Sequence, residues 1–198
     1  APQTRTALLL SLYATDPSVQ SIMAVIAQQE AVHNESYSYV LSSIVSLDKQ
    51  NKAFDFGRTD EVLIKRNQNI AKYYNEFVEN PTTENILKTL TYTTLLEGLF
   101  FYSGFAFFYN LARYNKMVGT STMISYINRD ELEHGRFISE LFRATLAENP
   151  ELNNDEFIGW VYEQFKESVA LEMEWSNYVL HDIDGIDIED MQGYIKYR

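Results

Sequence analysis

The pattern of apolar and polar positions is helical along nearly the whole chain. Apolar residues recur at spacings of three and four, which is the period of an amphipathic helix rather than of a strand. Asp16 followed by Pro17 predicts a helix start, because a carboxylate caps the first turn and proline suits the first helical position. We expect this helix to run to about Val45, and we expect residues 47–58 to form a polar loop.

The rest of the pattern predicts four longer helices and a short one. These run from Thr59 or Asp60 to before Pro81, from Pro81 to before Gly119, from Ser121 to Ala147, from Asp155 to Leu180, and from Ile188 to the C-terminus. The stretch from Leu95 to Tyr109 is apolar almost all round, which is typical of a central, buried helix. It is too short for a membrane span. We therefore predict an all-α bundle, with residues 1–198 forming a single domain.

A four-residue motif occurs twice. Glu30-Ala-Val-His33 returns, in residue type and spacing, as Glu131-Leu-Glu-His134, and these pairs use two of the chain's three histidines. Positions i and i+3 lie on one face of a helix, so each pair directs a carboxylate and an imidazole the same way. Two such helices that face each other form the ligand set of a di-iron or di-manganese carboxylate site.

A third carboxylate stands in the apolar central helix. Glu97 is the only charged residue between Lys88 and Arg113. Burying it as a free anion costs several kcal/mol, so it must be protonated, paired or bound to a cation. Metal ligation would satisfy Glu30, Glu97 and Glu131 together. Hard oxygen ligands with one imidazole per ion favour iron or manganese over zinc.

Less specific interpretations compete with the metal site. A single Glu-x-x-His is usually a solvated pair, and a lone buried glutamate is more often held by arginine or by backbone groups. The chain is therefore a radical-generating metalloprotein, a related di-metal oxidase or iron-storage protein, or a scaffold with salt-bridged pairs. The coincidence of both motifs with Glu97 favours metal. The third histidine, His181, is expected at the surface or capping a helix C-terminus.

Tyr37 follows His33 by four residues, which places its phenol one helical turn from the expected first metal. A redox-active metal pair could oxidise this phenol, and the resulting radical would survive only in a dry pocket. Three apolar residues at helical spacing from Glu97 or Glu131 could wall that pocket: Phe101, Phe105 and Ile127. Ordinary core packing would explain each of them alone.

Charge and composition exclude several partners. The net charge of −12 argues against a nucleic-acid binder and against an anionic membrane surface. Cysteine is absent, which fits a reducing compartment, and the first residues lack the pattern of a signal peptide. We expect a cytoplasmic protein.

Three segments together resemble the radical-generating small subunit of class I ribonucleotide reductase. They are residues 30–39, 96–105 and 127–134. The resemblance implies a ferritin-like helical bundle with additional helices, usually a homodimer, which holds a dinuclear iron or manganese centre (Fe/Fe or Mn/Mn). It also implies a large catalytic subunit as partner, which binds the nucleotide and makes deoxyribonucleotides.

The resemblance assigns a role to each motif residue. Glu30 and Glu131 would bridge the metals, His33 would bind the first, and Glu97 and His134 the second. Tyr37 would carry the radical inside the pocket, and Asp130 would hydrogen-bond His33.

One carboxylate of the expected six ligands is missing from this set. No Asp or Glu occurs in residues 1–15, and Asp16 reads as a helix cap. By the internal repeat, the first ligand helix would precede residue 1, so the sixth ligand is expected upstream in a longer chain or on another polypeptide. The family's C-terminal tail would lie beyond Arg198.

Overall fold

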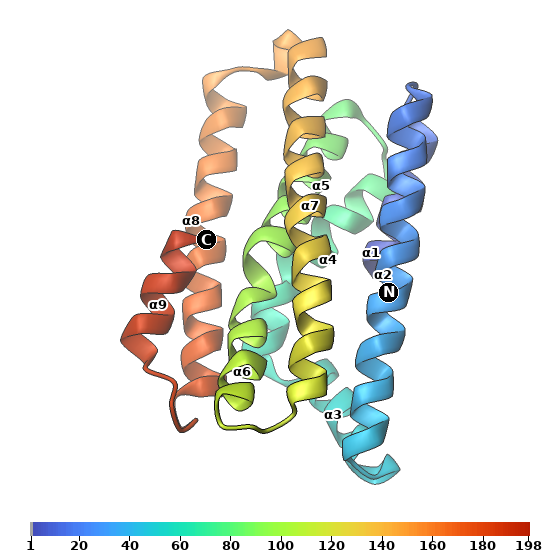
Figure 1. Cartoon of the computed structure of the whole chain (residues 1–198). Coiled ribbons are helices and arrows are strands. Elements are labelled where there is room, and N and C mark those ends of the chain that lie inside the picture. Colours follow the sequence, from blue (N-terminus) through green and yellow to red (C-terminus); the bar gives the residue numbers. More distant parts are fainter. Residues whose placement is uncertain (1) are drawn as a thin grey trace. The chain divides into compact units, whose positions relative to one another are not determined.

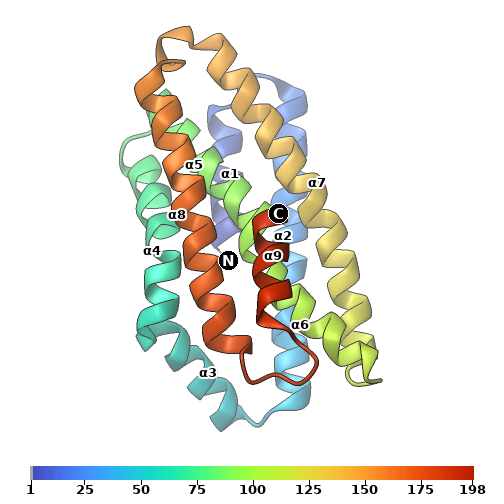
Figure 2. The ribbon, with the colours of Figure 1, turned by 90° about the vertical axis from the view of Figure 1, so that its left-hand side faces the viewer.

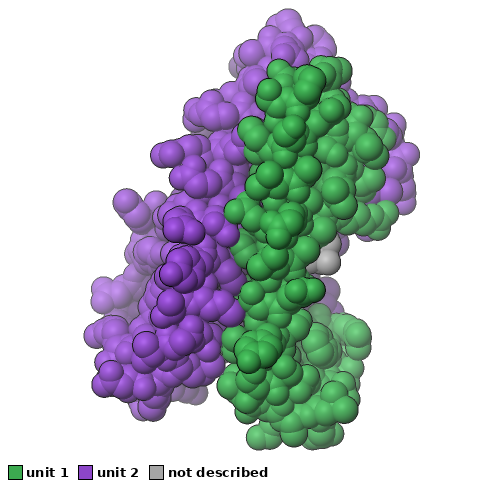
Figure 3. Space-filling model, turned by 45° about the vertical axis from the view of Figure 1, so that its right-hand side comes forward, with its two compact units in different colours: residues 1–59 green, residues 60–198 purple. Residues whose placement is uncertain are grey.

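The computed structural model describes residues 2–198, which form two compact units (Figure 3). Unit 1 extends to Thr59 and unit 2 covers Asp60–Arg198. Helices make up nearly all of the described residues, which contain no strand, so the all-α prediction is confirmed.

Unit 1 is a helical hairpin followed by a polar helix. Helices α1 (Pro2–Tyr13) and α2 (Pro17–Ile44) pack against each other. The predicted start of α2 is confirmed, because the Asp16 carboxylate accepts a hydrogen bond from the Ser18 N–H at 2.6 Å, which holds the pKa of Asp16 below its ordinary value. The buried residues of α2 form one stripe: Met23, Ile26, Ala27, Glu30 and His33.

Helix α3 (Leu47–Thr59) corrects the predicted polar loop over residues 47–58. It buries no residue, so no apolar stripe reveals it in the sequence. Ion pairs one turn apart support it, with Lys52 Nζ 2.9 Å from Asp48 and Arg58 Nη1 3.3 Å from Asp55. Pairs at this spacing stabilise a helix that buries no side chain.

Unit 2 is a helical bundle whose elements are arranged around one central run (Figures 1 and 2). Its elements are α4 (Glu61–Glu79), α5 (Thr83–Leu95), the π-helix η1 (Leu96–Phe100), α6 (Tyr102–Arg113), α7 (Val118–Glu148), the 3-10 turn η2 (Pro150–Leu152), α8 (Asp155–Leu180) and α9 (Ile188–Tyr197). Side-chain caps at Asp60, Thr82 and Asn154 begin α4, α5 and α8, close to where the sequence predicts these helices.

The run α5–η1–α6 is the buried centre of unit 2, as predicted. It contacts α4, α7 and α8. Leu87 and Leu90 are completely buried, and the Tyr92 ring stacks on Tyr73 at 4.8 Å. By length and composition alone, Thr83–Arg113 would also qualify as one membrane-crossing helix, but half of its most apolar window is buried within the fold.

The structure differs from the predicted third and fourth helices at two points. The third is not one continuous α-helix, since it widens into a π-turn at Leu96–Phe100. The fourth begins at Val118, so Gly119 lies inside α7 and does not precede it. Residue Met117, in the left-handed conformation (φ 50°), makes the turn before α7.

Candidate metal centre

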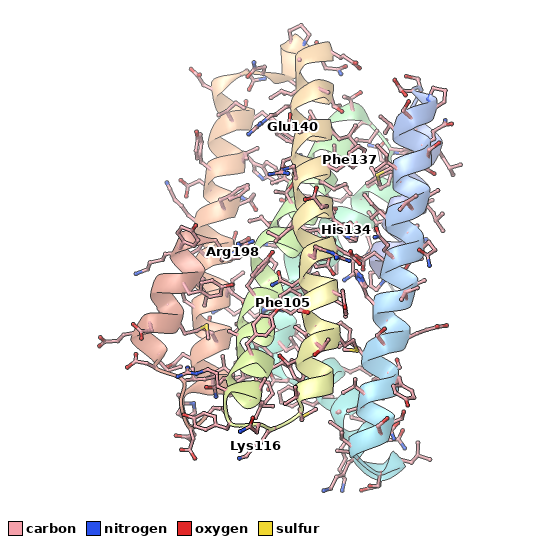
Figure 4. The ribbon with its side chains drawn as sticks, viewed as in Figure 1. Phe105, Lys116, His134, Phe137, Glu140 and Arg198 are labelled. Carbon is pink, nitrogen blue, oxygen red and sulfur yellow. The ribbon has the colours of Figure 1, made fainter. Side chains whose placement is uncertain are left out.

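Three of the predicted ligands converge inside unit 2. Glu131 and His134 project from the middle of α7, and Glu97 comes from the π-turn η1. His134 Nδ1 lies 3.1 Å from Glu131 Oε2 and 3.8 Å from Glu97 Oε2. The ligand atoms of all three residues lie within 4.8 Å of one another, and His134 marks the place in Figure 4.

Burial raises the free-energy cost of holding charged side chains in this cluster. Glu97, Glu131 and His134 are only 2%, 2% and 3% exposed. Two carboxylates this close in a low-dielectric interior repel each other unless a proton or a cation intervenes. Carboxylate oxygens together with an imidazole nitrogen are the donors that iron and manganese accept, so the residues fit such an ion.

Helix α7 packs directly against η1 at Gly135. A Cβ on Gly135 would lie 3.6 Å from the Cβ of Glu97, which is ordinary contact, but a longer side chain there would meet Glu97. The π-turn itself is a rare distortion that occurs frequently at functional sites. Both the contact with Gly135 and the π-turn involve Glu97.

In unit 1, the other Glu-x-x-His pair has the geometry that its spacing predicts. His33 Nδ1 lies 3.7 Å from Glu30 Oε1, so the two side chains point the same way along α2. That these residues join Glu97, Glu131 and His134 in one centre stays a prediction.

The three apolar residues predicted to surround the phenol lie together in unit 2. Phe105 and Ile127 belong to one buried cluster, and Phe101 packs against it with its ring 6.1 Å from that of Phe105 (Figure 4). Tyr37, on α2 of unit 1, is 37% exposed, and Asp130 is partly buried on α7. The roles of Tyr37 and Asp130 stay predictions.

A small cavity in unit 2 reaches one of the metal ligands. It has a volume of about 190 Å³ and is lined by Glu131, Tyr102, Arg136 and Arg198, among others. Tyr102 is 1% exposed, and burial raises the pKa of its phenol to about 12, although the Arg198 guanidinium lies 3.6 Å from the ring centroid and opposes the shift.

Sequence reasoning missed a further buried acid, Glu172 on α8. It is completely buried, and Arg66 Nε from α4 donates to its Oε2 at 2.7 Å. Burial raises the pKa of this carboxyl, and Arg66 and Ser103 oppose the rise. Its position among apolar residues of α8 is the one sequence signal that marks it. His181 behaves as predicted: it is the exposed C-cap of α8, with Nδ1 2.9 Å from the Asn177 carbonyl oxygen.

In ferritin-like metal–carboxylate proteins, glutamates and Glu-x-x-His pairs project from the helices into the core of a bundle. Unit 2 has this arrangement, with Glu97 beside the Glu131–His134 pair. Within that class, the chain belongs to the ribonucleotide reductase small chain family, whose family model matches residues 3–198. The predicted ferritin-like fold and family are therefore confirmed.

Three relatives illustrate the similarity. The chain is 47% identical over 196 residues to the ribonucleoside-diphosphate reductase subunit beta of Halalkalibacterium halodurans. The matched residues make up 98% of this chain and 57% of that protein. The chain is 36% identical over 186 residues to the subunit beta of Treponema pallidum, covering 93% and 53%. The ribonucleotide reductase R2 subunit from Clostridium botulinum superposes with a TM-score of 0.92 at 36% identity, covering 98% and 62%. The chain thus spans about half the length of these curated relatives.

Proposed function

We propose that this chain carries the metal centre of a ribonucleoside-diphosphate reductase small subunit, which generates a radical on Tyr37 and passes it to a large catalytic subunit. The product would be deoxyribonucleotides for DNA replication. The observation that carries the proposal is the buried cluster of Glu97, Glu131 and His134, found in a chain of this family. The names of the relatives from H. halodurans and T. pallidum support it.

The ligand set would hold two ions of iron or manganese. Glu131 would bridge them together with Glu30, while His33 would bind one ion, and Glu97 and His134 the other. The complete ligand set of such a site includes one further carboxylate. When bound, the metal pair would activate oxygen and supply the oxidising equivalent for the phenol of Tyr37.

The remaining residues would protect and orient this chemistry. Tyr37 would give up one electron and one proton to become a neutral phenoxyl radical. The apolar side chains of Phe101, Phe105 and Ile127 would exclude water and reductants from it. Asp130 would accept a hydrogen bond from the ring N–H of His33, which would fix the orientation of the imidazole for ligation.

We also infer the assembly and its location from family membership. A homodimer that docks on the large catalytic subunit, in the cytoplasm, fits the family and a chain without cysteine. The net charge of −12 offers no footprint for nucleic acid or for an anionic membrane.

The test uses the full-length polypeptide that contains this sequence. It is loaded with iron(II), exposed to oxygen, and examined by metal analysis and electron paramagnetic resonance. We expect two metal ions per polypeptide and a tyrosyl signal that Tyr37→Phe abolishes while metal content is kept. Tyr39→Phe is the matched control, because Tyr39 is two residues along the same helix and 74% exposed.

Three other results would each overturn a different part. A signal that persists in Tyr37→Phe would show that another tyrosine carries the radical. Two bound ions without any tyrosyl signal would indicate a different di-metal oxidase or an iron-storage protein. A polypeptide that stays metal-free under saturating iron would exclude the metal centre altogether.

A further inference from the structure

A buried ion pair lies outside the metal ligand set. Glu172 of α8 is completely buried, and the side chain of Arg66 from α4 is only 10% exposed. Arg66 Nε donates to Glu172 Oε2 at 2.7 Å, and Ser103 Oγ of α6 donates to Oε1 at 2.5 Å. Both carboxylate oxygens therefore have a donor, each from a different helix.

Arg66 makes a second contact, which goes to the π-turn. Its Nη2 donates to the backbone carbonyl oxygen of Phe100, the last residue of η1. The guanidinium also lies over the Phe100 ring at 4.8 Å, with the Trp175 ring of α8 at 5.4 Å. The Arg66 side chain thus contacts the last residue of the π-turn at two points, the backbone carbonyl and the ring of Phe100.

The π-turn is the segment that presents Glu97. Carbonyl groups at the end of a helical segment can lack partners within it, and a donor from another helix can then bind them. Glu97 and Phe100 belong to the same five-residue turn, so a shift of one displaces the other. An external donor on the Phe100 carbonyl therefore restricts where the Glu97 carboxylate can lie.

Stability alone does not account for this arrangement. Replacing a buried ion pair by apolar residues of similar size is often neutral or stabilising, because both charges must be desolvated. A planar guanidinium offers something that an apolar pair does not, namely several donors fixed in one plane. Here those donors reach Glu172 and the Phe100 carbonyl at once.

We propose that Arg66, Glu172 and Ser103 form a positioning cluster, which clamps the π-turn and so fixes Glu97 in its orientation as a metal ligand. Arg66 contacts the turn, Glu172 orients the Arg66 guanidinium, and Ser103 orients the Glu172 carboxylate. The inference rests on the proposed function, because it requires Glu97 to bind metal.

The test separates positioning from folding by a double substitution in the full-length polypeptide. Arg66→Met with Glu172→Leu removes both charges and keeps the apolar volume, so a folded protein is expected. The matched control is Lys65→Met with Glu174→Leu. That pair joins the same helices α4 and α8, with Nζ 2.6 Å from Oε2, but its side chains are 54% and 46% exposed.

Two measurements are made on each variant. The first is the affinity for manganese(II) at equilibrium, and the second is amide hydrogen exchange over residues 96–104 in metal-free protein. In the buried double variant, we expect affinity to fall about tenfold, the lower end of what support residues of metal ligands contribute, and exchange to accelerate. The surface control should match the wild type in both.

Each outcome decides a separate question. Unchanged affinity and unchanged exchange in the buried double variant, with metal binding by the wild type, would overturn the clamp but leave the proposed function standing. Faster exchange with unchanged affinity would also overturn the positioning role, since the turn would then move without consequence for Glu97. A wild type that binds no manganese or iron would overturn the proposed function, and with it Glu97 as a ligand to be positioned.

Discussion

Replacing Arg66 alone should destabilise the protein in a way that depends on pH. In Arg66→Met, Glu172 keeps its completely buried site and its Ser103 donor but loses the cation that balances its charge. Breaking a buried pair by removing one partner typically costs about 3–5 kcal/mol. We therefore expect the free energy of unfolding at pH 8 to fall by about that amount.

The sign of the pH dependence follows from the pKa of Glu172. Burial already raises it above its ordinary value of 4.5, and Arg66 opposes that rise, so removing Arg66 raises it further. A group whose folded pKa is raised contributes its stability below the ordinary pKa and loses it as pH rises through the folded pKa. As the pH falls from 8 toward 5, Glu172 in the variant takes up a proton more readily than an ordinary carboxyl, so the deficit should shrink toward about 1–3 kcal/mol, that of a lost hydrogen-bond partner.

Urea denaturation of the metal-free protein at pH 5 and pH 8, followed by circular dichroism, measures both values. Lys65→Met is the control, because its exposed pair with Glu174 should change stability by about 1 kcal/mol or less at either pH. A deficit equal at both pH values, or below about 1 kcal/mol at pH 8, would refute the reasoning that Glu172 is an ionised, Arg66-balanced acid.

Three further substitutions test other parts of unit 2. Gly135→Leu should lower the manganese content measured by elemental analysis while helical circular dichroism persists, because its side chain would meet Glu97; Gly135→Ala should bind as the wild type does. Tyr102→Phe should raise the free energy of unfolding by about 1 kcal/mol in urea titrations, since it removes a buried hydroxyl that has no hydrogen-bond partner among the described residues; a loss of stability would contradict this. Leu90→Ala should lower it by about 2–5 kcal/mol, because Leu90 is completely buried; a cost below about 1 kcal/mol would contradict the core assignment.

Local chemistry explains which parts of the fold were predictable. The starts of α2, α4 and α8 follow from capping residues that act within one turn, namely Asp16, Asp60 and Asn154. The ligand cluster was also accessible, because the i,i+3 geometry of Glu131 and His134 is local and Glu97 is isolated among apolar residues.

The missed features have causes that no local pattern carries. Helix α3 buries nothing, so its periodicity is invisible. The π-turn at Leu96–Phe100 and the Arg66–Glu172 pair depend on contacts between residues far apart in the chain, and their sequence neighbourhoods look like ordinary helix.

The buried glutamates of unit 2 are of two kinds, which differ in the basic side chain that the structure places beside them. Glu172 meets a permanently charged guanidinium, which balances the carboxylate whenever it is ionised. Glu97 and Glu131 share His134, an imidazole that is neutral when it ligates and so leaves two negative charges to balance. A cation would balance the charges of these two carboxylates, and the proposed metal centre would supply it. Arg66 connects the two sites through Phe100, so the Arg66–Glu172 pair supports the π-turn that carries Glu97.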